Sequence, residues 1–415
     1  MKTLGQGKGG SGAFAFNAML AWVLAMMVAW PTLLLAQTPA SATAGATAVI
    51  AVGPSREVRT LAEAARRLQG PTVIEVDAGT YSGDVAVWDG AQVTLRAVGG
   101  RVILRAEGAS AEGKAIWVVR NSTMQVSGFD FVGAQVPDAN GAGIRFESGR
   151  LDVRDCVFTG NQNGILTGND RQAVLDIENS EFGHNGHGDG GSHNLYVGYI
   201  ASLRVQGSWF HHAKRGHLLK SRAGRNFVAY NRLADGEGGI ASYELEFPSG
   251  GVAIVLGNVI HQAATTENPH IVSYGAEGYG WPENRLVMAH NTLVDDRRSG
   301  GVALRVRTGA QPVVVLNNLL VGGSGDLAPT IAAGQYTGNV RATAADLMPG
   351  SAPVGPQRLP ARSPLAENTV RPGAVGGVDL QPVLEFSPPR GTVARRDARP
   401  SAPAPGAFAA GADGR

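Results

Sequence analysis

Two segments of the chain, 192-SHNLYVG-198 and 216-GHLLKSR-222, repeat one pattern at a constant offset, the distance from His193 to His217. A third segment, 241-ASYELEF-247, continues the pattern. Side chains alternate between the two sides of a strand, so the leucines of all three segments are expected to face one side. The segments therefore predict three neighbouring strands that stack in register.

On the other side of these strands the same spacing predicts a polar stripe. At this offset Tyr196 lies beside Lys220, and Glu244 and Glu246 lie beside Lys220 and Arg222 respectively. Neighbouring strands are about 4.8 Å apart, which brings these side chains within contact distance. The chain is poor in charge elsewhere, so the stripe is the candidate site; an ordinary ladder of salt bridges is the alternative.

The repeat extends far beyond these segments. Phenylalanines recur at 129, 158, 182 and 210, and asparagines at 231, 258, 291 and 317. Strands and turns at a loose period in the twenties, with no apolar helix face between them, indicate a solenoid. A propeller blade would need about 40 residues or more.

The opening from Thr60 to Tyr81, the repeated Gly-Ile and Asn-Leu strands and the asparagines at turns resemble the pectin-lyase-like superfamily. The resemblance implies an all-β chain folded as a single right-handed parallel β-helix, with three strands per coil and asparagine ladders at the turns. We expect this solenoid over residues 57–345. The apolar spacing of residues 57–69 predicts a short N-terminal capping helix, with Thr60 as its N-cap.

The two ends of the chain differ from the repeat. Residues 1–42 combine Lys2 and Lys8, an apolar run and a small-residue cleavage signal, which predicts a secretory signal peptide or, alternatively, a retained membrane anchor. Either reading predicts export, to the periplasm or the medium, with membrane contact only through this segment. Residues 346–415 are rich in Pro, Ala and Gly; we expect partial packing on the solenoid and a disordered end.

The composition of the chain limits which classes of partner it is expected to bind. The 415 residues carry a net charge of +2 and only 17% are charged, which argues against nucleic-acid binding. The only cysteine, Cys156, excludes an intramolecular disulfide. We expect a monomer.

The residue types in the stripe suit β-elimination on an acidic, uronate-containing polysaccharide. Arg222 or a bound cation would neutralise the uronate carboxylate. Lys220 or a histidine would act as the base, and Tyr196 or His217 as the acid. Lyases with this fold use Lys and Arg in such roles, several of them with calcium, so the resemblance makes calcium a candidate cofactor.

Further polar residues are expected to contact the substrate. These candidates are His193, Asn194, Glu244, Glu246, Glu277, Arg305 and Arg307. Glu277 belongs to the aromatic-rich segment 274–285, a loop that either stacks sugar rings or simply covers the coil. The two arginines either extend a cationic track or are ordinary solvated charges.

A second cluster, His184, His187 and Asp189 ahead of His193, has spacing compatible with a metal site, although polar residues are common in such a Gly-rich turn. The sequence as a whole favours an exported polysaccharide lyase or a related uronate epimerase. The alternative is a non-catalytic β-helix that binds glycan or builds a cell surface. Unsaturated product from alginate, pectate or glycosaminoglycan would separate the two.

Overall fold

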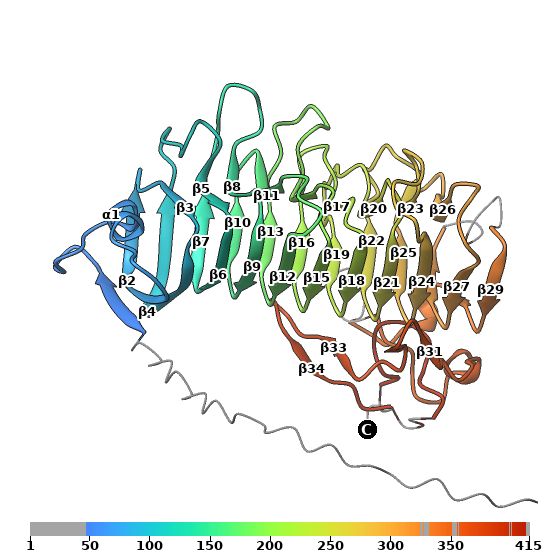
Figure 1. The fold of residues 1–415 in the computed structure, drawn as a ribbon. Coiled ribbons are helices and arrows are strands. Elements are labelled where there is room, and N and C mark those ends of the chain that lie inside the picture. The colour runs from blue at the N-terminus through green and yellow to red at the C-terminus, as the bar shows by residue number, and fades with distance from the viewer. Residues whose placement is uncertain are drawn as a thin grey trace, which may run out of the picture. The chain divides into compact units, whose positions relative to one another are not determined.

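The computed structural model describes residues 47–323, 327, 332–350, 355, 357–397, 399 and 401–411. The predicted signal peptide or anchor, 1–42, lies outside them. No helix in this part of the chain is long and apolar enough to cross a membrane. The described chain is a parallel β-helix in which each coil contributes one strand to each of three faces (Figure 1).

Each face is a stack of parallel strands in chain order. The first face holds β6 (Ser122–Ser127), β9 (Gly149–Arg154), β12 (Val174–Glu178), β15 (Ser202–Gln206), β18 (Arg225–Ala229), β21 (Val252–Leu256), β24 (Arg285–Ala289), β27 (Val313–Leu316) and β29 (Gly334–Thr337). The second face holds β7 (Phe129–Val132), β10 (Val157–Thr159), β13 (Glu181–Gly183), β16 (Trp209–His211), β19 (Arg232–Ala234), β22 (Val259–Gln262), β25 (Thr292–Asp295), β28 (Leu319–Gly322) and β30 (Val340–Ala342). The third face holds β3 (Ala86–Asp89), β5 (Ala115–Arg120), β8 (Ala142–Phe146), β11 (Asn163–Thr167), β14 (Leu195–Val197), β17 (Leu219–Ser221), β20 (Leu245–Phe247), β23 (His270–Tyr274) and β26 (Val302–Val306).

The N-terminal end is built from β1 (Ala48–Val52), β2 (Thr72–Ser82), β4 (Gln92–Arg105) and the helix α1 (Leu61–Arg66). The predicted capping helix is confirmed in a shorter form, because Val58 forms a parallel bridge with Val52 instead of joining the helix. Thr60 caps α1 as expected, with its hydroxyl accepting from the Glu63 N–H. The Asp84 carboxylate accepts two further N–H groups at this end.

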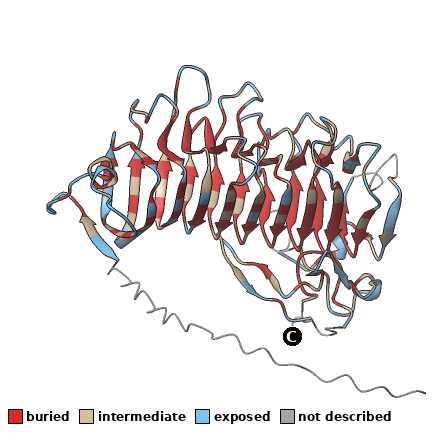
Figure 2. Cartoon of the chain, in the orientation of Figure 1, coloured by how far each residue is buried: buried red, intermediate tan, exposed pale blue. Residues whose placement is uncertain are grey.

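Stacked side chains fill the interior of the β-helix. The strands that carry them are largely buried and are red in Figure 2. Phe131, Phe158, Phe182 and Phe210 form a continuous stack with ring centroids 4.6–4.8 Å apart. The sequence expectation placed Phe129 in this stack, which is wrong by one alternation of the strand. Phe129 and Phe131 are both buried, so both satisfy the same apolar pattern.

The corner between the first and second faces carries a ladder of buried amides. Asn231, Asn258, Asn291 and Asn318 each accept, through Oδ1, the backbone N–H of the ladder residue one coil earlier. Asn317, expected in this ladder, instead adopts a left-handed φ of 54° immediately before it. Buried N–H and C=O groups need partners, and these amides supply them.

The C-terminal segment contains η1 (Ala344–Asp346), η2 (Pro364–Glu367) and the short pairs β31 (Ala374–Val375) with β32 (Val378–Asp379) and β33 (Leu384–Phe386) with β34 (Thr392–Ala394). It packs on the solenoid: Phe386 and Phe408 are buried against Val259 and Trp209. Its described part extends to residue 411, and within it Ala407 is fully buried.

We predict that Asn258→Ala destabilises the solenoid by about 1–3 kcal/mol, because the variant leaves the Asn231 N–H and the Val228 carbonyl buried without their amide partner. Urea denaturation followed by circular dichroism measures the shift. Asn140→Ala, at an exposed loop position, is the matched control. Equal midpoints for the two variants would contradict the role assigned to the ladder.

Candidate active site on the third face

The first two strands of the predicted stripe stack as expected. Tyr196 on β14 pairs with Lys220 on β17, and the leucines before them pair with each other and point into the core. The third strand is shifted, since β20 places Glu246 beside Lys220, where Glu244 was expected. The chain between β17 and β20 is therefore longer than the constant offset predicts, by the step from Glu244 to Glu246. A shift of two positions puts Glu246 on the same side of the sheet as Lys220 and leaves Glu244 outside the strand.

Glu244, expected beside Lys220, is buried, and this expectation is wrong. It precedes β20 and has no exposed surface, and neither carboxylate oxygen has a hydrogen-bond partner. Burial, with Asp235 nearby, raises the pKa of Glu244 well above its ordinary value. A neutral interior carboxyl has no access to substrate.

The loop between β23 and β24 contributes a carboxylate to the site. It carries Glu277, whose carboxylate accepts from Nε and Nη2 of Arg222 at 2.7–3.0 Å. The same carboxylate lies 3.2 Å from Nζ of Lys220. Arg222 also donates to Oη of Tyr196 at 2.9 Å. Two cations thus contact one carboxylate, and Arg222 does so in the bidentate geometry that a guanidinium favours.

The aromatic residues of this loop hold it in place. The Trp281 indole N–H donates to the backbone carbonyl of Arg222 at 2.9 Å, and Oη of Tyr279 donates to the carbonyl of Arg307 at 2.5 Å. Tyr274, at the end of β23, is fully buried in the core. Tyr279 and Trp281 therefore anchor the loop to the coil and remain partly exposed.

Two histidines lie beneath the cations. The His217 backbone N–H donates to Nδ1 of His193, so a neutral His193 carries its proton on Nε2. Nε2 of His217 lies 3.0 Å from Glu246, whose Oε2 is also 3.4 Å from Lys220 Nζ. Burial, followed by the nearby charges of His217, Lys220 and Arg222, holds the pKa of His193 well below its ordinary value.

The charges of the site balance one another. Burial opposes ionisation of the Glu246 and Glu277 carboxyls, yet His217 and Lys220 lower the pKa of Glu246, and Arg222 and Lys220 lower that of Glu277. Burial also opposes the charge on Arg222, but Glu277 and Tyr196 raise its pKa above the ordinary value. Both oxygens of Glu277 accept from Arg222 or Lys220, and Oε2 of Glu246 lies near Lys220 and His217. Two cations among two carboxylates suit an anionic ligand better than calcium, which prefers six to eight oxygen ligands.

The remaining expected residues are scattered. Arg305 lies 3.5 Å from Oη of Tyr243, and Arg307 donates to the carbonyl of Ala276. Asn194 is buried at the turn onto the third face, immediately before β14, where its Oδ1 accepts from the Asn185 N–H, and it cannot face a substrate. Sequence reasoning missed Trp281 because its contact depends on the path of the loop.

The expected metal ligands do not come together. His187 and Asp189 are exposed, and Asp189 caps its own turn by accepting from the Gly191 N–H. His184 instead joins His211 and His212, with one ring nitrogen of each within 4.8 Å of the others. The candidates His184, His187 and Asp189 rested on local spacing, whereas side chains in a solenoid meet between coils, as His184 does with His212.

Comparison with known proteins supports the fold. No protein-family model matches the sequence, and no curated protein matches it. The crystal structure of pectate lyase Pel9A superposes with a TM-score of 0.60 over 88% of this chain and 97% of that chain, at 12% identity. The PL6 family polysaccharide lyase Pedsa3628 from Pseudopedobacter saltans matches 72% of this chain and 85% of its own, with a TM-score of 0.36 and 12% identity. The first likeness confirms the parallel β-helix that the sequence predicts.

We predict that His193 remains neutral in the folded protein at pH values where an unfolded histidine is protonated. Because its folded pKa is depressed, His193 contributes stability above the unfolded pKa of about 6.5, and this stability is lost as pH falls below that value, at up to about 1.4 kcal/mol per pH unit. Urea unfolding between pH 7.5 and 5 should show a shallower pH dependence in His193→Gln than in the wild type. An identical pH dependence of the free energy of unfolding in His193→Gln and in the wild type would contradict this prediction.

Proposed function

We propose that this protein is an exported enzyme, periplasmic or secreted, that cleaves an acidic polysaccharide by β-elimination at the third-face site of Tyr196, Lys220 and Arg222. The observation that carries the proposal is the carboxylate clamp. Arg222 grips Glu277 through two nitrogens while Lys220 contacts the same group. Neutralising a carboxylate is what β-elimination beside a uronate requires.

Glu277 marks where the substrate carboxylate binds. Its side chain is 46% exposed, whereas those of Lys220 and Arg222 are 13% and 14% exposed. The exposed partner on the loop is the one that can be displaced. An incoming uronate takes its place, so Arg222 has a carboxylate partner both before and after the substrate binds.

Lys220 is the proposed base. Its ammonium must first lose a proton, and Glu246, 3.4 Å away, is placed to accept it. Lys220 then removes the proton on the carbon beside the uronate carboxylate, and the electron pair forms the double bond as the glycosidic C–O bond breaks. His217 contacts Glu246 and has a 9% exposed side chain, so it positions that carboxylate and does not act as the acid.

Tyr196 is the proposed acid. Its Oη already accepts a hydrogen bond from Arg222, which leaves its own proton available for the leaving oxygen. The same guanidinium stabilises the phenolate that forms. Glu246 then releases to solvent the proton that it took from Lys220, and Tyr196 regains one from solvent, so the site returns to its starting state. Each proton of the elimination therefore has a donor and an acceptor in the site.

We predict that Lys220→Ala abolishes turnover, whereas Lys214→Ala, which changes an exposed lysine on the loop before β17, does not. Unsaturated product released from alginate, pectate and glycosaminoglycans is followed by ultraviolet absorbance. Circular dichroism checks that both variants are folded. Full activity in Lys220→Ala would show that the reaction does not take place at this site. Binding of a glycan by the wild type without unsaturated product would favour the non-catalytic alternative.

Arg222→Lys is expected to impair activity, because a lysine does not reproduce the two-toothed contact with a carboxylate. Arg298→Lys, at an exposed position, controls for the loss of a guanidinium. Steady-state kinetics on the substrate found above measure the effect. Equal kcat/KM values in the two variants would contradict the clamp.

Glu277→Gln tests displacement. Removal of the internal carboxylate should lower KM by roughly two- to fivefold with little change in kcat, since a half-exposed ion pair contributes up to about 1 kcal/mol. The measurement is KM and kcat at fixed ionic strength. A higher KM would show that Glu277 assists binding instead of competing with the substrate.

A further inference from the structure

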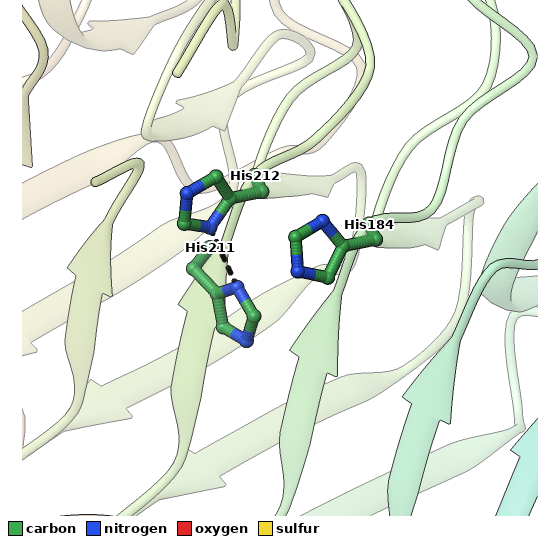
Figure 3. A group of neighbouring side chains, drawn as sticks. All are labelled: His184, His211 and His212. Atoms are coloured by element: carbon green, nitrogen blue, oxygen red, sulfur yellow. Dashed lines mark hydrogen bonds between the residues drawn. The ribbon is translucent and has the colours of Figure 1, made fainter. Parts of the chain in front are cut away.

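Three histidines meet where β13 and β16 end, at the opening of the loops that lead to the third face. His184 follows β13, His211 ends β16 and His212 follows it. Their rings gather about one point (Figure 3), and one nitrogen from each lies within 4.8 Å of the others. Nδ1 of His211 is 2.8 Å from Nδ1 of His212, so one hydrogen bond joins the two imidazoles and brings their Nδ1 atoms together.

Ring contacts hold the cluster together, with His211 buried, His212 half-buried and His184 exposed. The His184 and His212 rings stack with centroids 4.8 Å apart, and His211 lies against the indole of Trp209 at 4.1 Å. Both His184 and His212 adopt left-handed φ values, 57° and 46°, which non-glycine residues adopt at some cost. Tertiary contacts therefore hold these rings together in spite of the local backbone preference.

A carboxylate orients one of the rings. Nε2 of His211 lies 3.4 Å from Glu181 on the neighbouring strand, and Arg390 of the C-terminal segment donates to the same carboxylate at 3.0 Å. With the Nε2 proton directed to Glu181, Nδ1 of His211 presents its lone pair to the cluster. Histidines that ligate metals commonly have this arrangement, with a carboxylate behind the ring.

A glycine makes room for the same ring. Gly183 pairs with His211 across the strands, and a Cβ on Gly183 would lie 2.1 Å from Cε1 of His211. No larger residue leaves the imidazole in place. His212 in turn lines a cavity of about 530 Å³ together with Arg232, His261 and Asp296, so the cluster is open to solvent on one side.

We propose that His184, His211 and His212 bind one divalent transition-metal ion of the zinc type. Three imidazole nitrogens suit zinc and its neighbours, whereas calcium prefers six to eight oxygens. Three protein ligands leave one position of a tetrahedral site for water or another ligand. The 2.8 Å contact between His211 and His212 holds a shared proton, which the metal displaces when both Nδ1 atoms bind it. This site is distinct from the clamp of Lys220 and Arg222 and does not depend on the proposed function.

The test uses the full chain, purified without a histidine tag and freed of metal with a chelator. Titration with zinc chloride in a calorimeter should give one ion per chain, and cobalt(II) should give the visible absorption bands of a four-coordinate site. His184→Asn and His212→Asn should each weaken zinc binding at least about tenfold. Asparagine tolerates left-handed φ values, so these variants keep the backbone. His187→Asn, an exposed histidine in the same loop, should bind zinc as the wild type does.

Glu181→Gln provides a second readout that removes no ligand. It should lower zinc affinity by about 10- to 100-fold while the stoichiometry remains one. Urea midpoints equal to that of the wild type show that each variant is folded. Zinc binding unchanged in both His184→Asn and His212→Asn, or calcium that competes with zinc at equal concentration, would overturn the site. So would a wild-type protein that binds no zinc.

Discussion

Hydrogen bonding in register between successive coils is the constraint on which this structure depends. A parallel strand that slipped by one residue would turn its apolar side chains to solvent and its polar ones to the core. The corner between the first and second faces prevents such a slip. From β9 to β30 every such corner has two residues, such as Asn179-Ser180 and Gly257-Asn258. The first residue is left-handed in both examples, and the second belongs to the column of ladder residues that hydrogen-bond from coil to coil.

Because that corner is fixed in length, variation is confined to the other two connections. The loops from the second to the third face hold the histidine cluster and the buried Glu244. The connection after β23 holds Glu277 and Trp281. A rigid stack thus carries loops of variable length at two of its three edges, where functional side chains are usually found.

The sequence could predict the solenoid because its signals repeat. The pairing of Tyr196 with Lys220 followed from a single offset and is correct. The next offset is longer, and no pattern in the sequence reveals where a loop lengthens. The sequence prediction also chose Phe129 where the stack contains Phe131, and Asn317 where the ladder contains Asn318. In each case two nearby residues of the same type satisfy the pattern.

Contacts between coils were the hardest to predict. The metal set of His184, His187 and Asp189 was inferred from close spacing, as in a helix or a single turn. In a solenoid the neighbour in space lies one coil away, and Phe182 already pairs with Phe210 across such a step. His184 and His212 are separated by the same number of residues as Phe182 and Phe210. The spacing that brings the two histidines together was therefore present in the sequence.

The energetics of the clamp bear on which glycans the proposed enzyme would accept. Lys220 and Arg222 are mostly buried, and a buried cation without a partner costs several kcal/mol. In the free protein Glu246 and Glu277 are the partners of these two cations. A uronate that displaces Glu277 leaves the charge of the site unchanged, whereas a neutral sugar would leave the cations with one carboxylate between them. The site would therefore reject neutral glycans mainly through the cost of the unpaired charges, and its preference for acidic chains follows from the balance already present in the free protein.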